Sequence, residues 1–196
     1  MKWKAAVLLA ASLAVFFPKP DRAIAGPSQN VAAARAETKL QHIEKNSELA
    51  RPDRAPTELT DNEINAYFAA GKVELPAGVQ SVIFREQPGV VTASCRVDFD
   101  QVEAGRRSAN PLLSLFSGIH DVVIEANARG TAGQGLVEVQ SVSLDGVEIP
   151  RFVLELFVEK FLQPKYPNVG LDSRFPLPQR IDTAVVGMQK LTISQK

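Results

Sequence analysis

The sequence predicts an α+β fold: a curved antiparallel sheet wrapped around one long helix in the C-terminal half, with a short N-terminal helix. Three observations predict it. Residues 149–163 carry a wide apolar arc, several segments alternate apolar and polar side chains between turn residues, and the elements follow the order helix, strands, strands, helix, strands. That order favours helices segregated from an antiparallel sheet over alternating βαβ units.

Residues 149–163 are predicted to form the long helix around which the fold is organised. Pro150 suits the first turn of a helix, and Pro164 ends it. Polar side chains form one narrow strip: Arg151, Glu155, Glu159 and Gln163. Apolar side chains fill an arc of roughly 200°, about twice the stripe that a surface helix needs: Val153, Leu154, Leu156, Phe157, Val158 and Phe161. This helix should therefore be covered on most of its circumference.

A short helix is predicted to begin at Thr60 and to end near Gly71. Thr60 and Glu63 have the spacing of a capping box, in which each residue satisfies a backbone N–H of the other. Strands are predicted from alternation, β-branched residues and flanking turn residues at 79–85, 91–100, 121–129, 135–144, 180–186 and 189–194. Residues 111–117 are predicted to form a short helical or apolar segment.

The N-terminus has the composition of a secretory signal, which we place at residues 1–25. Lys2 and Lys4 precede an apolar run at 5–17 that is too short to span a bilayer, and a small-residue cleavage site precedes Gly26. We therefore expect an exported protein, periplasmic or extracellular, that is soluble after signal cleavage. An uncleaved short anchor is the alternative.

Residues 26–56 are polar, and we expect a tether or a loosely attached helix there. A helix in this segment would present only a thin apolar face built on Leu40 and Ile43. Residues 51–56, with two prolines, resemble a linker. Residues 57–196 are then expected to form a single α+β domain.

Composition excludes several classes of function. The 22 basic and 22 acidic side chains give a formal net charge of zero, so no strong attraction to nucleic acid is expected. Cys95 is the only cysteine, which rules out an internal disulfide. Its place among alternating apolar residues favours a small buried hydrophobe over a reactive thiol.

Residues that could carry chemistry are few. With His42 and His120 as the only histidines, a His- or Cys-based metal centre is not expected. His120 lies at a strand entry without a nucleophile motif, and Asp98 and Asp100 share an exposed strand face, where solvated carboxylates are expected. We therefore predict no catalytic residues, no metal and no cofactor, and keep an enzyme of unrecognised type as the least favoured alternative.

Two motifs carry a family resemblance. Leu59-Thr-Asp-Asn-Glu-Ile-Asn65 is similar to a helix start found in small exported bacterial envelope proteins, and Asp145-Gly-Val-Glu-Ile-Pro150 precedes an apolar helix, a proline-marked crossing and a final hairpin. Over residues 57–194 the chain resembles the SMP-like/TULIP lipid-binding superfamily, including LmeA-like phospholipid-binding proteins. The resemblance implies a curved sheet around a long helix, an apolar groove for acyl chains, and no catalytic residues.

The functional expectation is therefore a non-catalytic exported protein that binds lipid or another apolar ligand between helix and sheet. Val153, Phe157, Phe161 and Phe99 are the candidate groove residues. The wide apolar arc is equally compatible with a filled core. In that case the chain would be a structural or protein-interaction domain of the envelope, with a sheet edge or the patch at 111–116 as its contact surface. Peripheral contact with a membrane is a further alternative.

Overall fold

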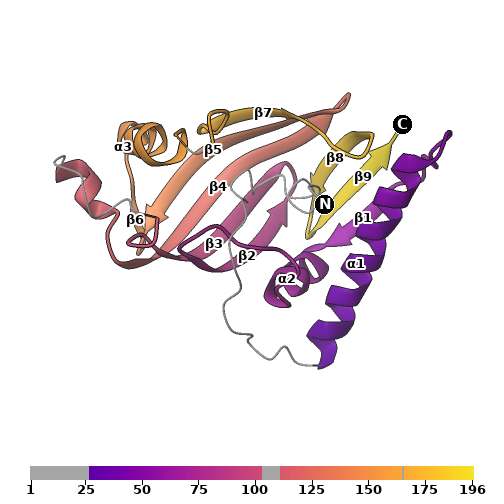
Figure 1. Cartoon of the computed structure of the whole chain (residues 1–196), viewed down its shortest axis with the longest axis horizontal. Coiled ribbons are helices and arrows are strands. Elements are labelled where there is room, and N and C mark those ends of the chain that lie inside the picture. The colour runs from indigo at the N-terminus through magenta and orange to yellow at the C-terminus, as the bar shows by residue number, and fades with distance from the viewer. Residues whose placement is uncertain (1–26, 103–110, 165) are drawn as a thin grey trace.

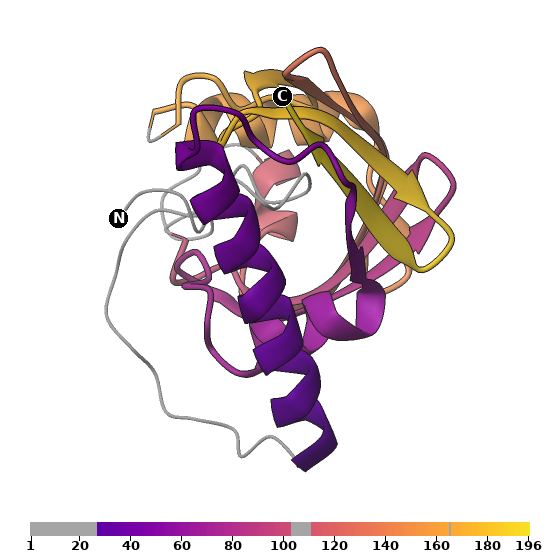
Figure 2. The same cartoon turned by 90° about the vertical axis from the view of Figure 1, so that its right-hand side faces the viewer.

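The computed structural model describes residues 27–102, 111–164 and 166–196, and within them the chain forms one curved antiparallel sheet with helices on its inner face (Figures 1 and 2). The elements are α1 (Pro27–Glu48), β1 (Thr57–Thr60), α2 (Asp61–Ala69), β2 (Val79–Gln87), β3 (Val90–Asp98), the 3-10 helix η1 (Pro111–Leu115), β4 (Ile119–Thr131), β5 (Gln134–Leu144), β6 (Val147–Glu148), α3 (Arg151–Phe157), the π-helix η2 (Val158–Leu162), β7 (Asp172–Pro176), β8 (Ile181–Gly187) and β9 (Lys190–Gln195). The predicted signal peptide at 1–25 lies outside the described residues.

Strand β4 organises the sheet. The strand order is β1-β9-β8-β4-β3-β2. Strand β5 pairs with the other edge of β4, and both β6 and β7 pair with β5. Along one edge, β4 pairs with β3 as far as Asn127 and then with β8 at Arg129 and Gly130. The β2–β3 hairpin and the β8–β9 hairpin therefore leave the same edge of β4 one after the other. The turn of the first hairpin is joined to strand β8 of the second by a hydrogen bond from the Gly89 N–H to the Val186 carbonyl (3.0 Å).

The predicted long helix in the C-terminal half is wrong, and with it the predicted architecture. Residues 149–163 form only α3, of seven residues, followed by the five-residue π-helix η2. The longest described helix is α1, with 22 residues, in the N-terminal part of the chain. Pro150 and Pro164 confine the C-terminal segment to a short stretch, whereas 28–48 contains no proline or glycine and many good helix formers. The width of an apolar arc indicates how much of a helix surface is buried against other elements, but it does not indicate how long the helix is.

Helix α1 packs into the core, which corrects the expectation of a tether or a loosely attached helix at 26–56. Ile43 is 0% exposed, and Ala36 and Leu40 are buried beside it. Alanines make this possible, because Ala32 and Ala33 lie against Ala66 of α2 and small side chains let two helices approach closely. The thin face expected from Leu40 and Ile43 alone omitted the alanines.

The C-terminal end of α1 is joined to the last strand by buried amides. The Asn46 Nδ2 donates to the Gln195 Oε1 (2.8 Å) and to the Asp53 carbonyl (2.8 Å). The Gln195 Nε2 donates in turn to the Ile43 carbonyl (2.8 Å) and the Gln179 carbonyl (2.6 Å). Buried amide groups need such partners, since leaving one unsatisfied costs about 1–3 kcal/mol. The network fixes where α1 lies on the sheet.

Several local predictions are confirmed. Thr60 caps α2: its Oγ1 accepts from the Glu63 N–H (3.3 Å), and its N–H donates to the Glu63 Oε2 (2.9 Å). The predicted strand at 91–100 corresponds to β3, and its alternation places Val91, Ala93 and Val97 inward. The hairpin predicted around residues 130–135 is β4–β5, whose turn has left-handed backbone at Ala132 (φ 53°) and Gly133 (φ 75°). That turn matches the right-handed twist of the strands.

Candidate apolar site on the inner sheet face

The inner face of the sheet carries two separate hydrophobic cores, one under α1 and α2 and the other under α3 and η1. Strand β3 contributes to both, with Val91 and Ala93 in the first core and Val97 in the second. Figure 1 shows α1 with α2 and α3 with η1 near opposite ends of the sheet. All of these helices therefore cover the same face, but they cover different parts of it.

Between the two cores lies a set of apolar side chains that the helices leave half-buried. We name it the inner strip, and it consists of Val82, Cys95, Ile124, Val137 and Val139. Cys95 and Ile124 pack against both cores. Four neighbouring strands contribute, because Val82 is directly opposite Cys95, Ile124 is opposite Ala93, and Val139 is opposite Ala126. The strip crosses β2, β3, β4 and β5 as one apolar surface.

An aromatic cluster adjoins the strip at the α3 end. The ring of Phe157 lies 4.3 Å from that of Phe116, 5.8 Å from that of Phe99 and 5.4 Å from that of Phe161, measured between centroids. Phe99 and Phe116 are buried, whereas Phe157 and Phe161 are half-buried. Tilted and edge-to-face pairs at these separations are favourable contacts. The cluster thus has a closed base and a partly open side formed by α3 and η2.

The four residues predicted from the sequence as groove residues do come together, but they differ in exposure. Val153, Phe157, Phe161 and Phe99 all belong to the core under α3. Val153 is 2% exposed and Phe99 is 6% exposed, so both are packed side chains and do not line an open surface. Phe157 and Phe161 are the two that a ligand could touch directly.

Sequence reasoning missed most of the inner strip as a site. Alternation identified Cys95 as an inward-facing residue, yet no local pattern could show that Ile124 and Val139 would lie near it across β4 and β5. Cys95 itself is an inert part of the strip, because burial raises the pKa of its thiol to about 11. At neutral pH the thiol stays protonated, and it acts as a small apolar side chain.

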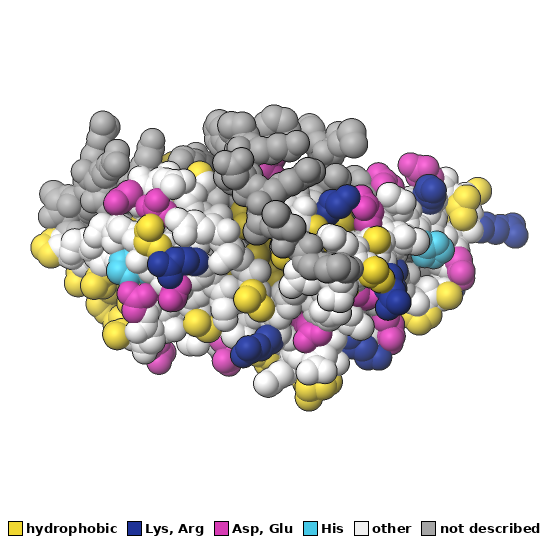
Figure 3. Space-filling view, turned by 90° about the horizontal axis from the view of Figure 1, so that it is seen from below, with side chains coloured by type: hydrophobic (Ala, Val, Ile, Leu, Met, Phe, Trp, Pro, Cys, Tyr) yellow, Lys and Arg dark blue, Asp and Glu magenta, His cyan; other side chains and the backbone are white. Residues whose placement is uncertain are grey.

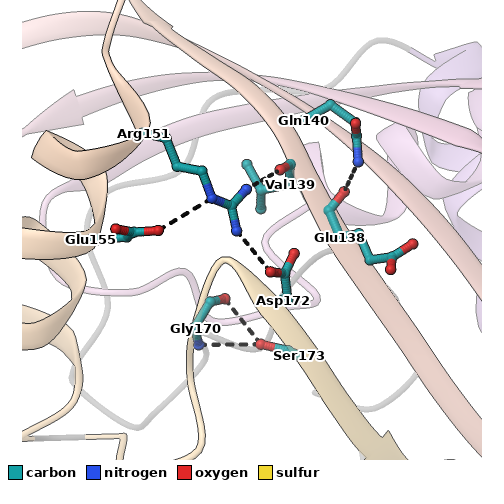
Figure 4. A network of polar contacts seen from close by, with 8 residues as sticks. All are labelled: Glu138, Val139, Gln140, Arg151, Glu155, Gly170, Asp172 and Ser173. Atoms are coloured by element: carbon teal, nitrogen blue, oxygen red, sulfur yellow. Dashed lines mark hydrogen bonds and ion pairs between the residues drawn. The ribbon is translucent and has the colours of Figure 1, made fainter.

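Arg151 holds the start of α3 beside the strip. As Figure 4 shows, its guanidinium group donates to the Val139 carbonyl (3.2 Å) on β5, to the Asp172 Oδ2 (2.7 Å) on β7 and to the Glu155 Oε1 (3.2 Å). These groups are exposed, so each ion pair contributes little to stability. Together they link α3 to the edge of β5 at the point where neither β6 nor β7 pairs with it.

The polar groups nearest this end serve the fold. The His120 Nδ1 lies 2.6 Å from the Asp145 Oδ2, and its Nε2 lies 2.7 Å from the Ser117 carbonyl oxygen. Both ring nitrogens face acceptors, so the hydrogen bond to Asp145 raises the pKa of His120, and the same contact lowers the pKa of Asp145. The nitrogen that a catalytic base would use is occupied by a backbone carbonyl. Asp100 accepts from the Gly118 N–H (3.2 Å) and likewise orders a turn.

A third apolar feature lies at the end of the molecule that carries η1. We call it the apolar tip, and it comprises the exposed side chains of Leu112, Leu115, Ile119, Val147 and Phe152. In Figure 3, hydrophobic side chains gather at the left-hand end, which is the end that holds η1 in Figure 1. Scattered exposed hydrophobic residues are normal, but several from adjacent elements indicate a contact surface.

Within the described ranges, no three His, Cys, Asp or Glu side chains are grouped so that they could hold a metal ion. No helix in these ranges is both long enough and apolar enough to cross a membrane.

None of the protein-family models, curated proteins or solved structures compared with the chain matches it.

Proposed function

We propose that this chain is an exported envelope protein that binds an acyl lipid, or a similarly elongated apolar ligand, without covalent chemistry. The observation that carries the proposal is the inner strip: apolar side chains from four strands, left half-buried between two closed cores. The ligand would lie along the strip, with one end against Phe157 and Phe161.

The chemistry of the strip favours hydrocarbon. Its five side chains are apolar, and hydrocarbon that leaves water for such a surface gains about 0.8 kcal/mol for each buried CH₂ group. Strands lie about 4.8 Å apart, so a strip across four of them extends over roughly 14 Å. That length suits an acyl chain better than a small ring. Binding sites of this kind use apolar walls and few polar contacts.

Single tryptophan reporters on β4 would test the proposal. In a Trp3→Phe background, Ile124→Trp places the only indole on the inner strip, and Val123→Trp places it on the opposite face of the same strand, where Val123 is exposed. A phospholipid with brominated acyl chains should quench the fluorescence of Ile124→Trp and leave that of Val123→Trp unchanged. Circular dichroism should first show that both variants are folded. If the lipid then quenches the two variants equally, or quenches neither of them, the ligand does not bind at the strip.

Native mass spectrometry of the full chain purified from its own host provides a second readout that needs no substitution. A co-purifying lipid, released by organic solvent and identified by its mass, would support the proposal.

The proposed export has a separate test, because the periplasmic or secreted protein should begin at or near Gly26. An N-terminus at Met1 in that fraction would contradict signal cleavage.

The apolar tip favours a second candidate function, that of an envelope interaction domain. Leu112 and Leu115 lie exposed on η1, and Phe152 lies exposed at the start of α3. If this is the functional surface, a Leu112→Glu/Leu115→Glu double variant should lose its cross-links to envelope components and keep its structure. The quenching of Ile124→Trp by lipid should be unaffected in the same variant, so the two candidates can be separated.

A further inference from the structure

Glu86 is an acidic residue on the apolar inner face of β2. It lies two residues after Phe84, on the same side of the strand, and is only 5% exposed. Its partner across the ladder is the buried Val91 of β3. Carboxylates are seldom buried in this way unless they are paired with a cation or hydrogen-bonded.

The backbone of Glu86 takes part in a seam that joins three elements. Its carbonyl accepts from the Gln189 N–H (2.9 Å) in the β8–β9 turn, and the Gln189 carbonyl accepts from the Asp61 N–H (3.0 Å) at the start of α2. Next to these contacts, the Gly89 N–H of the β2–β3 turn donates to Val186 of β8 (3.0 Å). We call this set of contacts the seam, and it lies where the two hairpins on the same edge of β4 meet.

Within the part of the chain that the structure describes, no cation compensates the charge of the Glu86 side chain. Its Oε2 is buried without a hydrogen-bond partner, and no ion pair to Glu86 occurs among the described residues. The cations of the neighbouring elements are engaged elsewhere, Lys39 with Glu63 of α2 and Lys190 with Glu58 of β1. Across the ladder, β3 presents the uncharged Val91. The charge that does act on Glu86 is that of Asp61, and it has the same sign.

We propose that Glu86 makes the seam pH-sensitive: the β2 end and the β8–β9 turn stay together while its carboxyl group is protonated, and they separate more often once it ionises. An ionised carboxylate at this position would be buried, unpaired and next to another acid, so local opening that exposes it to water becomes favourable. This inference does not depend on lipid binding.

The direction of the pH dependence follows from the two protonation states. Burial, with Asp61 as the second cause, raises the pKa of Glu86 from 4.5 to about 7. The folded chain then holds a proton that the unfolded chain has lost. The stabilisation is therefore complete below pH 4.5 and is lost as the pH rises through 7. Between pH 5 and pH 8 the equilibrium constant for unfolding should rise roughly 70-fold from this group alone.

Hydrogen exchange of the full chain at pH 6 and pH 8.5, corrected for the intrinsic rate, would test this. The amides of Gly89 and Gln189 should lose protection at pH 8.5 in the natural sequence and keep it in Glu86→Gln, which cannot ionise. Glu125→Gln is the matched control, because Glu125 is exposed on the outer face of β4. The same loss of protection in Glu86→Gln as in the natural sequence would overturn the proposal.

Asp61→Asn keeps the test decisive if Glu86→Gln fails to fold. Removing the like charge should move the midpoint of the seam opening to lower pH, because a carboxyl group without an acidic neighbour ionises more easily. If Asp61 does not act on Glu86, the midpoint should stay where it is in the natural sequence. A midpoint that does not fall in Asp61→Asn, or seam amides whose protection is independent of pH in the natural sequence, would refute the role of Glu86.

Discussion

The side-chain amide of Asn65 pairs with both backbone groups of Phe84. The Asn65 Oδ1 accepts from the Phe84 N–H (2.7 Å), and its Nδ2 donates to the Phe84 carbonyl (2.8 Å). A residue of α2 thus occupies hydrogen-bonding positions on the free edge of β2, where another strand could otherwise add. Asn65 therefore contributes to stability and protects the edge of the sheet.

Asn65→Ala should destabilise the fold by about 1–3 kcal/mol, since it leaves two backbone groups of β2 without partners. The urea unfolding midpoint measures this, and light scattering should show concentration-dependent association through the open edge. Asn62→Ala is the control, because Asn62 lies on the exposed side of the same helix. Equal midpoints for the two variants would show that the Asn65 amide does not hold the edge.

Ile43→Ala should destabilise the chain by about 2–5 kcal/mol, because the removed side chain is fully buried in the core under α1. Leu49→Ala should change stability by less than about 0.5 kcal/mol, since Leu49 is 54% exposed just beyond the same helix. Thermal or urea unfolding distinguishes them. If residues 26–56 were only a tether, both substitutions would change the free energy of unfolding by equally small amounts.

Gly130→Ala should cost about 1–3 kcal/mol through overpacking where β4 meets β8. A Cβ atom at Gly130 would lie 2.8 Å from the Ala184 Cβ and 2.9 Å from its backbone nitrogen, and backbone cannot move aside easily. Gly170→Ala is the comparison, because its nearest contact, at 3.5 Å, is an ordinary one. Unfolding curves that coincide for the two variants would exclude close packing at Gly130.

Asp145→Asn should lower the pKa of His120, because the hydrogen bond to Asp145 is the main cause that raises it. In the natural sequence, the stabilisation from the protonated ring is complete below the unfolded pKa of 6.5 and is lost as the pH rises through the higher folded value. Asp145→Asn should weaken that dependence. NMR titration of the His120 ring measures its pKa, and urea unfolding at several pH values measures the dependence of stability on pH. An unchanged pKa in Asp145→Asn would contradict the assignment of its cause.

Local signals were sufficient for most of the strands and for α2. Alternation located β3, the capping residues Thr60 and Glu63 located the start of α2, and the glycine-rich turn located the β4–β5 hairpin. These features depend on neighbours within a few residues, so a single sequence contains them. The attachment of α1 was misjudged because it depends on the packing of its alanines against α2, which lies far away in the sequence. The length of α3 was misjudged because the width of its apolar arc was taken as a sign of a long helix, although Pro150 and Pro164 confine the segment.

The candidate site was predictable only in part, for the same reason. Phe157 and Phe161 were identified because helical spacing places them on one face. The inner strip depends on the register of four strands, and a slip of one residue in β4 would turn Ile124 outward and Val123 inward. Register of this kind is set by the assembled sheet, so the sequence of any one strand does not contain it.

The contact between Asn46 and Gln195 has a consequence for the timing of folding. These residues are 149 positions apart, and Gln195 lies in β9, which follows every other described strand in the sequence. Helix α1 is synthesised first among the described elements, yet the strand that fixes its C-terminal end is synthesised last. Contacts this distant in sequence form slowly. A nascent chain therefore cannot fix the C-terminal end of α1 until Gln195 has been synthesised, so we expect the docking of α1 to follow the synthesis of all the described strands.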